Sequence, residues 1–170
     1  MYKENNPRTG WDVWVLPLAG DRKPVPVANT NFDEREGQFS PDVRWIAYQS
    51  NESGRGEIYV QPFPGPGAKL QVSTNGGSQV RWRRDGKELF YIAPDNKLMA
   101  VPITVAPNGQ TLEPGTPVEL FPTQIASNPA GRQQYAVSSD GQRFLILVEP
   151  EGATASPITV ILNWAAGVKK

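Results

Sequence analysis

The sequence predicts an all-β fold, a partial β-propeller of about three to four blades with up to four antiparallel strands each. Two repeated patterns predict it. One is an apolar residue, two further positions, an Asp and a short apolar strand, at Phe39–Tyr48, Trp82–Tyr91 and Val137–Ile146. The other is a strand that ends in Pro, at Val13–Leu18, Ile58–Phe63 and Leu98–Ile103. Asp42 and Asp85 are 43 residues apart, and Pro17, Pro62 and Pro102 follow one another at 45 and 40 residues. A period of roughly 40–45 residues is typical of propeller blades.

Composition agrees with many short strands and excludes several functions. Gly and Pro are abundant, at 16 and 17 of 170 residues, as expected where tight turns join strands. Lys plus Arg equals Asp plus Glu, 17 each, so no net field attracts nucleic acid or an anionic membrane. No stretch is long enough to span a bilayer, and no signal peptide opens the chain. Without His or Cys, a Ser-His-Asp triad, a His-ligated metal, a thiolate nucleophile and a disulfide are excluded, and we expect no cofactor or metal.

Short apolar or alternating runs between turn residues define the strands in order. The first unit, about 11–29, has two strands: Asp12–Pro17 and Pro24–Ala28. The second, about 34–73, has four: Gln38–Ser40, Trp45–Gln49, Glu57–Pro62 and Lys69–Ser73. The third, about 76–121, also has four: Gln79–Arg83, Glu88–Ile92, Leu98–Ile103 and Pro117–Phe121. The last, about 132–164, has three: Tyr135–Ser138, Phe144–Val148 and Ile158–Asn163.

The two ends of this pattern are incomplete. Residues 1–10 and 165–170 are expected to be tails, and the strands between them do not make a whole number of four-stranded blades. We therefore expect a segment of a larger propeller, with Met1 not the natural start of the fold. Open strand edges invite pairing, so we expect oligomerisation or completion by upstream blades.

Three aspartates recur at the start of the blades: Asp42, Asp85 and Asp140. One interpretation is a ring of carboxylates around a channel or metal. The other, which we favour, is a structural turn in which each Asp accepts backbone N–H bonds, since Gly follows two of them. Val43 replaces Gly in the first copy, so that turn is expected to be strained or of another type.

Two groups of side chains are candidates for an interaction surface. Most aromatics at strand spacing are expected to pack between blades, but Trp45 and Trp82 lie nearest strand ends and could face a partner. The one basic cluster lies next to Trp82 and consists of Arg81, Arg83, Arg84 and Lys87. Such a cluster can bind nucleic acid or phosphate, but a solvated strand edge is favoured because the total charge is zero.

These residues resemble a known family. The segment Ser40–Tyr48, except at Val43, resembles the phrase Ser-Pro-Asp-Gly-Arg-x-Ile-Ala-Tyr of TolB-like, WD-repeat-like propellers. More narrowly, the chain resembles the C-terminal end of bacterial serine/threonine protein kinases that carry such a propeller. The segments that carry this resemblance are Asp12–Leu18, Gln38–Gly54, Gly76–Pro102, Ser139–Ile146 and the ending Pro157–Trp164 with Gly167 and Lys169-Lys170.

The resemblance implies a non-catalytic sensory or protein-interaction module at the C-terminus of a kinase, because no kinase motif occurs in this chain. A protein partner is implied, and no nucleic acid. The alternatives are a stand-alone TolB-like envelope scaffold and the propeller of a prolyl-oligopeptidase-type hydrolase. The compartment stays open: the envelope or periplasmic side for a membrane-anchored kinase, otherwise the cytoplasm.

Overall fold

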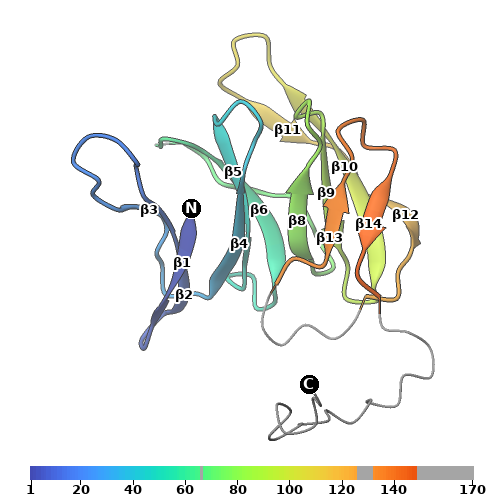
Figure 1. The fold of residues 1–170 in the computed structure, drawn as a ribbon, viewed down its shortest axis with the longest axis horizontal. Coiled ribbons are helices and arrows are strands. Elements are labelled where there is room, and N and C mark those ends of the chain that lie inside the picture. The colour runs from blue at the N-terminus through green and yellow to red at the C-terminus, as the bar shows by residue number, and fades with distance from the viewer. Residues whose placement is uncertain (66, 126–131, 149–170) are drawn as a thin grey trace, which may run out of the picture.

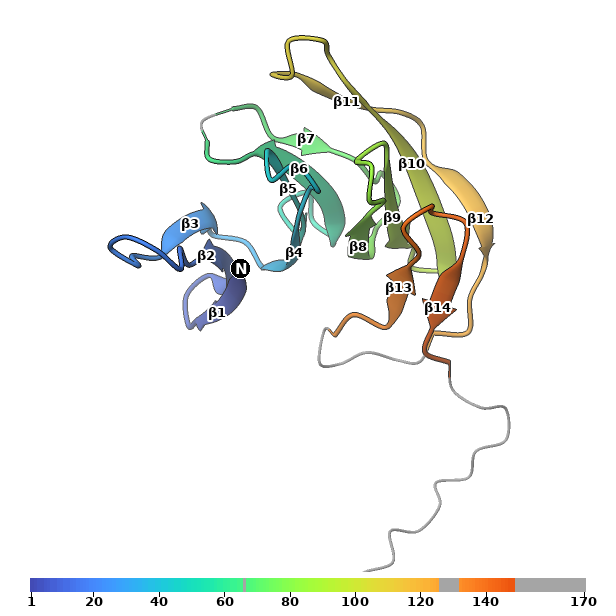
Figure 2. The same cartoon turned by 45° about the horizontal axis from the view of Figure 1, so that its top comes forward.

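The computed structural model describes residues 1–65, 67–125 and 132–148, and this part of the chain contains β-strands and no helix. Four antiparallel sheets follow one another around an open arc (Figures 1 and 2). The expected all-β fold and partial propeller are thus confirmed. We call the sheets blades 1 to 4 in chain order, and the strand of each complete blade nearest the propeller axis its inner strand.

Blades 1 and 2 differ in one strand. Blade 1 has the order β1-β2-β3, and blade 2 the order β4-β5-β6-β7. The bounds are β1 Tyr2–Asn6, β2 Gly10–Val15, β3 Val25–Ala28, β4 Glu34–Phe39, β5 Trp45–Ser50, β6 Glu57–Pro62 and β7 Leu70–Gln71. Blade 2 therefore has the four strands that the sequence predicts.

Blades 3 and 4 complete the described arc. Blade 3 contains β8 Ser78–Trp82, β9 Glu88–Ile92, β10 Lys97–Val105 and β12 Val118–Pro122, with β11 Leu112–Pro114 paired to the end of β10. Blade 4 contains β13 Tyr135–Val137 and β14 Phe144–Ile146. The third strand expected for blade 4, at Ile158–Asn163, lies outside the described residues.

Two elements differ from the expectation. Residues 1–10, expected to be a tail, contain β1, which pairs with β2 from Tyr2 opposite Trp14 to Asn6 opposite Gly10. The polar sequence of β1 lacks the alternation that identifies a strand, so only its pairing with β2 reveals it. No strand was expected between Leu98–Ile103 and Pro117–Phe121, but β11 returns along β10, with Leu112 opposite Val105.

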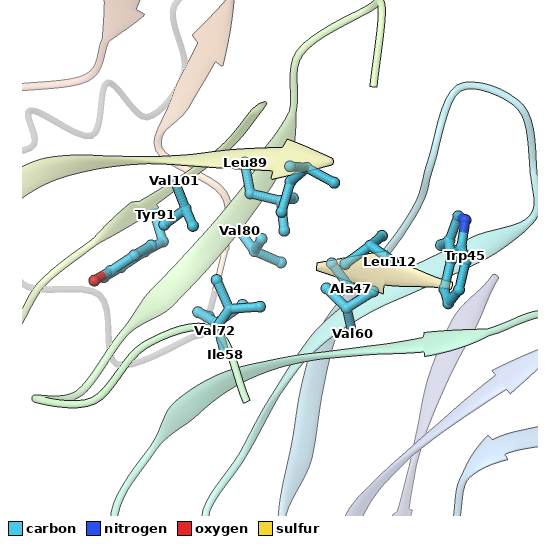
Figure 3. Packing of buried hydrophobic residues seen from close by; sticks show 11 residues of the cluster. Trp45, Ala47, Ile58, Val60, Val72, Val80, Leu89, Tyr91, Val101 and Leu112 are labelled. Carbon is cyan, nitrogen blue, oxygen red and sulfur yellow. The ribbon is translucent and has the colours of Figure 1, made fainter. Parts of the chain in front are cut away.

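The hydrophobic core lies between blades rather than inside one sheet. Between blades 2 and 3, buried side chains from both sheets interlock, with Leu112 of β11 closing the cluster beside Trp45 (Figure 3). Blade 2 packs against blade 1 around Tyr48, and blade 3 packs against blade 4 around Phe90. Each blade is stabilised by burial of apolar area against its neighbour, so a single sheet has no core of its own.

A second link between blades is polar. At a bulge in each inner strand, Glu36 of β4 and Gln79 of β8 have the same positive φ, 56°. The backbone N–H of Gln79 donates to the Glu36 carboxylate. One blade further, the Gln79 amide oxygen accepts the backbone N–H of Gln134 at 2.7 Å, while its NH₂ donates to the Gln134 side chain at 3.1 Å. We call these contacts the inner-strand bonds.

The inner-strand bonds predict the effect of Gln79→Ala. Gln79 is 4% exposed, and the variant removes both of its hydrogen bonds to Gln134, which together contribute about 1–3 kcal/mol to the unfolding free energy. Gln and Ala both carry a Cβ, so the backbone strain at the positive φ of position 79 is the same in the variant and the parent. Urea unfolding measures the difference. The exposed Gln110→Ala is the control, with a change below about 0.5 kcal/mol; equal effects of the two variants would refute the role of the bond.

Candidate functional site

The three recurring aspartates lie in equivalent turns at one end of the blades, which we call the turn face. Each carboxylate accepts the backbone N–H two residues on: Asp42 from Arg44 at 3.2 Å, Asp85 from Lys87 at 3.0 Å and Asp140 from Gln142 at 3.0 Å. Ser hydroxyls add bonds at 2.6 Å to Asp42 and 2.5 Å to Asp140. The carboxylates are held by their own turns, in the geometry of an Asx turn.

Val43 adopts the turn conformation that Gly takes in the other two copies. Its φ is 60°, beside 74° for Gly86 and 72° for Gly141. A β-branched side chain is strained in this left-handed region. This turn was expected to be either strained or of another type. Its backbone has the same form as the other two turns, so the turn is strained at Val43.

The two candidate tryptophans lie on either side of the gap between blades 2 and 3. Trp45, at the start of β5, is 3% exposed and packs in the cluster with Leu112 (Figure 3). Its indole N–H is buried and has no hydrogen-bond partner. Trp82, at the end of β8, is half-buried and donates its Nε1–H to the backbone oxygen of Gln38 at 3.3 Å. Both rings serve the packing of the two blades, and both also line a pocket described below.

The basic cluster divides among three environments. Arg81 points to β4, where its Nη1 donates to the Gln38 side chain at 3.2 Å. Arg83 is paired, with two bonds of 2.7 Å to Asp85 and one of 2.6 Å to Glu88. Arg84 is exposed. The residues therefore do not form one basic patch, because Arg81 lies in β8 and bonds to β4, whereas Arg83 and Arg84 lie beyond the end of the strand and only Arg83 is held by carboxylates.

A pocket on the turn face brings several of these side chains together. It has a volume of about 350 Å³ and is lined by Trp45, Trp82, Arg84, Asp42 and Asp85, with Val105 and Leu112 opposite. We call it the turn-face pocket. A larger pocket, of about 650 Å³, lies beside it, and Trp45 and Leu112 line both. Arg44 is the charged residue among those that line the larger pocket.

Sequence reasoning missed a polar group on the inner strands. Three side chains on or beside these strands have buried polar atoms without a hydrogen-bond partner: Arg81 at Nε, Gln133 at its amide and Tyr135 at its hydroxyl. Nearby, burial raises the pKa of the Glu36 carboxyl, against the opposing attraction of Lys3 and Arg81. The 43-residue spacing between Glu36 and Gln79, equal to that between Asp42 and Asp85, is the signal that could have identified these positions.

The fully buried carboxylates outside these pockets are satisfied by local bonds. Glu57 accepts the backbone N–H of Gly76 at 2.8 Å, the Ser73 hydroxyl and the Arg55 guanidinium at 2.7 Å. Within the described ranges, no group of His, Cys, Asp and Glu could hold a metal ion. No helix in this part of the chain is long and apolar enough to cross a membrane.

Comparison with known proteins supports the fold. TolB from Acinetobacter baumannii is similar in structure, with a TM-score of 0.50 and 16% identity, over 86% of this chain and 45% of that chain. A protein assigned as a 6-phosphogluconolactonase from Bacteroides uniformis gives a TM-score of 0.49 and 16% identity, over 83% of this chain and 41% of that chain. No family model matches, and no curated protein matches.

The fold and its repeated turns define the class as β-propellers, and the likeness to TolB makes the fold TolB-like. The chain spans less than half the length of these solved structures. The match to TolB therefore covers an arc of blades within that longer chain.

The turn geometry predicts opposite effects of two substitutions. Val43→Gly removes the strained side chain, which is 52% exposed and contributes little to the core. We expect the unfolding free energy to rise by about 0.5–1 kcal/mol. Gly86→Val, for which the nearest atom to an added Cβ is Pro41 Cδ at 3.8 Å, should lower it by about 1–2 kcal/mol through the backbone alone. Urea unfolding of both variants measures this, and changes of the same sign would contradict it.

The ion pair of Arg83 predicts an acid-sensitive contribution to stability. Its hydrogen bonds lower the pKa of Asp85 to about 2. A lowered carboxyl pKa contributes stability above the unfolded value, about 3.9, and that contribution is lost as the pH falls toward 2. Asp85→Asn should therefore be less stable than the parent at pH 6, by about 0–1 kcal/mol for an exposed pair. Urea unfolding at pH 6 and pH 2 tests this; a difference that is the same at both values would contradict it.

Proposed function

We propose that this chain is a non-catalytic β-propeller module that binds a protein partner, and that it is the C-terminal part of a bacterial serine/threonine protein kinase. The propeller scaffold rests on the fold. The kinase context rests on the resemblance of Gln38–Gly54 and the ending Pro157–Trp164 to the propeller ends of such kinases. In this arrangement the propeller receives a signal or a partner, and phosphoryl transfer belongs to another domain.

The observation that carries the binding role is the turn-face pocket. It combines two tryptophan rings with the exposed guanidinium of Arg84. Val43 and Val105 are exposed on the same face, at 52% and 38%. Aromatic and Arg side chains together are typical of the energetically important centre of protein interfaces. A partner segment with an apolar side chain for the pocket and a carboxylate for Arg84 fits this surface.

The carboxylates around the pocket favour binding over catalysis. A general acid or base needs a carboxyl group that is free to exchange a proton with substrate. Asp42 and Asp85 instead accept bonds from their own turns, and Asp85 is also paired with Arg83. With neither His nor Cys in the sequence, we assign no side chain of this chain a catalytic role.

A stand-alone scaffold of the TolB type is the second candidate. The structural likeness to TolB favours it, but at 16% identity that likeness concerns the fold. The two candidates share a non-catalytic propeller and differ in what the gene encodes before these residues.

Site-specific cross-linking tests the binding role. A photoreactive phenylalanine analogue at Arg84 should cross-link a protein in cells, because Arg84 is exposed beside the turn-face pocket. The same analogue at Ser53, exposed in the turn between β5 and β6, is the control. Arg84→Glu should then weaken binding of the identified partner about tenfold or more, as expected for charge reversal at an interface.

Three results would contradict the proposal. Equal cross-linking at Arg84 and Ser53 would exclude a specific surface at the turn face. Phosphotransferase or peptidase activity of the purified chain would exclude a non-catalytic module. The DNA before the first codon separates the two parents: a continuous frame with a kinase catalytic loop supports the kinase, and a frame with a signal peptide and no kinase supports the scaffold.

A further inference from the structure

Blade 1 begins with the second strand of a blade. The register of each sheet establishes this, because three tyrosines occupy the same position opposite the Pro-terminated strand. The pairs are Tyr2 with Trp14, Tyr48 with Tyr59 and Tyr91 with Met99. Strand β1 is therefore equivalent to β5 and β9, which both pair on their other side with an inner strand, β4 and β8.

The inner edge of β1 has no such partner within the described residues. The sheet order β1-β2-β3 makes β1 an edge strand, so its outward N–H and C=O groups can pair with another strand. A cavity of about 160 Å³ lies here, between Tyr2 and Lys3 of β1 and Glu36 of β4. The place that an inner strand would take is thus open along β1 (Figure 2).

The inner-strand bonds specify what this place recognises. The N–H of Gln79 donates to Glu36, and the N–H of Gln134 donates to Gln79, so each side chain accepts from the next blade. Glu36 occupies in β4 the bulge position that Gln79 occupies in β8. Its N–H is therefore equivalent to that of Gln79, which donates to the preceding blade. No side chain of the described residues accepts the N–H of Glu36, and Lys3 supplies positive charge beside it.

We propose that the edge of β1 binds an extended polypeptide strand whose Gln or Glu side chain accepts the backbone N–H of Glu36. The strand has the pattern of β4 and β8 and continues the existing interface between inner strands by one blade. The inference rests on the proposed function in one respect: it requires that the chain act as part of a larger propeller. Recognition comes from main-chain bonds along the edge and from one side-chain acceptor, as in β-augmentation.

A fusion tests the proposal on the full chain. A copy of residues 77–89, which contain β8 and its Asp-Gly turn, is attached directly before Met1. The equivalence of Tyr2 with Tyr91 then places Met1 at the position of Phe90, so the copied strand can fold back onto β1. We expect amide hydrogen exchange of Lys3 to Asn6 to slow at least about tenfold. The melting temperature should rise by several degrees, as it does for about 1–2 kcal/mol in a chain of this size.

Matched fusions separate the edge from the acceptor. A copy with its thirteen residues in reverse order controls for length and composition, and equal exchange in both fusions would overturn binding at β1. Gln79→Ala in the copy alone should lower the melting temperature by about 2–4 °C relative to the unmodified fusion, as expected for one lost hydrogen bond. Gln79→Glu in the copy should keep the melting temperature of the unmodified fusion, because Glu also supplies an acceptor. Equal melting temperatures of the fusions with Ala and with Gln at this position would show that the side chain does not accept the N–H of Glu36.

These readouts are independent of the partner at the turn face. Loss of cross-linking at Arg84 would refute the proposed binding role and leave the exchange at β1 unchanged. Failure of all fusions to protect β1 would refute the edge inference and leave the turn-face result unchanged.

Discussion

The bond from one inner strand to the backbone of the next is the interaction on which this arc of blades depends. Hydrophobic packing between sheets supplies most of the stabilisation, but apolar side chains in contact do not fix a rotation between two sheets. A side-chain oxygen that meets a backbone N–H does, since the bond tolerates only a narrow range of distance and angle. Glu36 and Gln79 provide this twice in succession, at bulges of identical φ. The angle between successive blades is set at the axis, and the cores form around it.

The repeats made most of the fold predictable from sequence, because strand, turn and spacing recur together. Strand Glu57–Pro62 has the predicted bounds, and Glu88–Ile92 likewise. Two strands were not predicted: β1, whose polar sequence gives no periodic signal, and β11, which has three residues and is defined by its pairing with the long β10. In both, the partner strand decides the conformation, and pairing between distant residues is not visible in local composition.

The candidate site was less predictable than the fold. Trp82 and Arg84 line one pocket with Trp45, but the sequence indicated only that they could belong to an interaction surface. Yet neighbouring residues of the basic cluster serve different purposes, with Arg81 turned to the axis and Arg83 held by Asp85 and Glu88. Composition identifies a cluster, but β8 ends at Trp82, so the cluster is divided between the strand and the turn that follows it. Whether a polar atom on the inner strands is buried without a partner depends on how the blades pack, and the sequence does not show this.

Use of a backbone N–H as donor has a consequence for how such chains evolve. The peptide group is supplied by every residue except Pro, so a blade needs only one acceptor side chain to join its neighbour. Glu at one blade and Gln at the next meet this condition equally, while the remaining surface is free to diverge. Gene duplication can therefore add blades, and recombination can exchange them, without a co-evolved pair at each junction. An architecture joined in this way can retain its shape while most of its sequence changes.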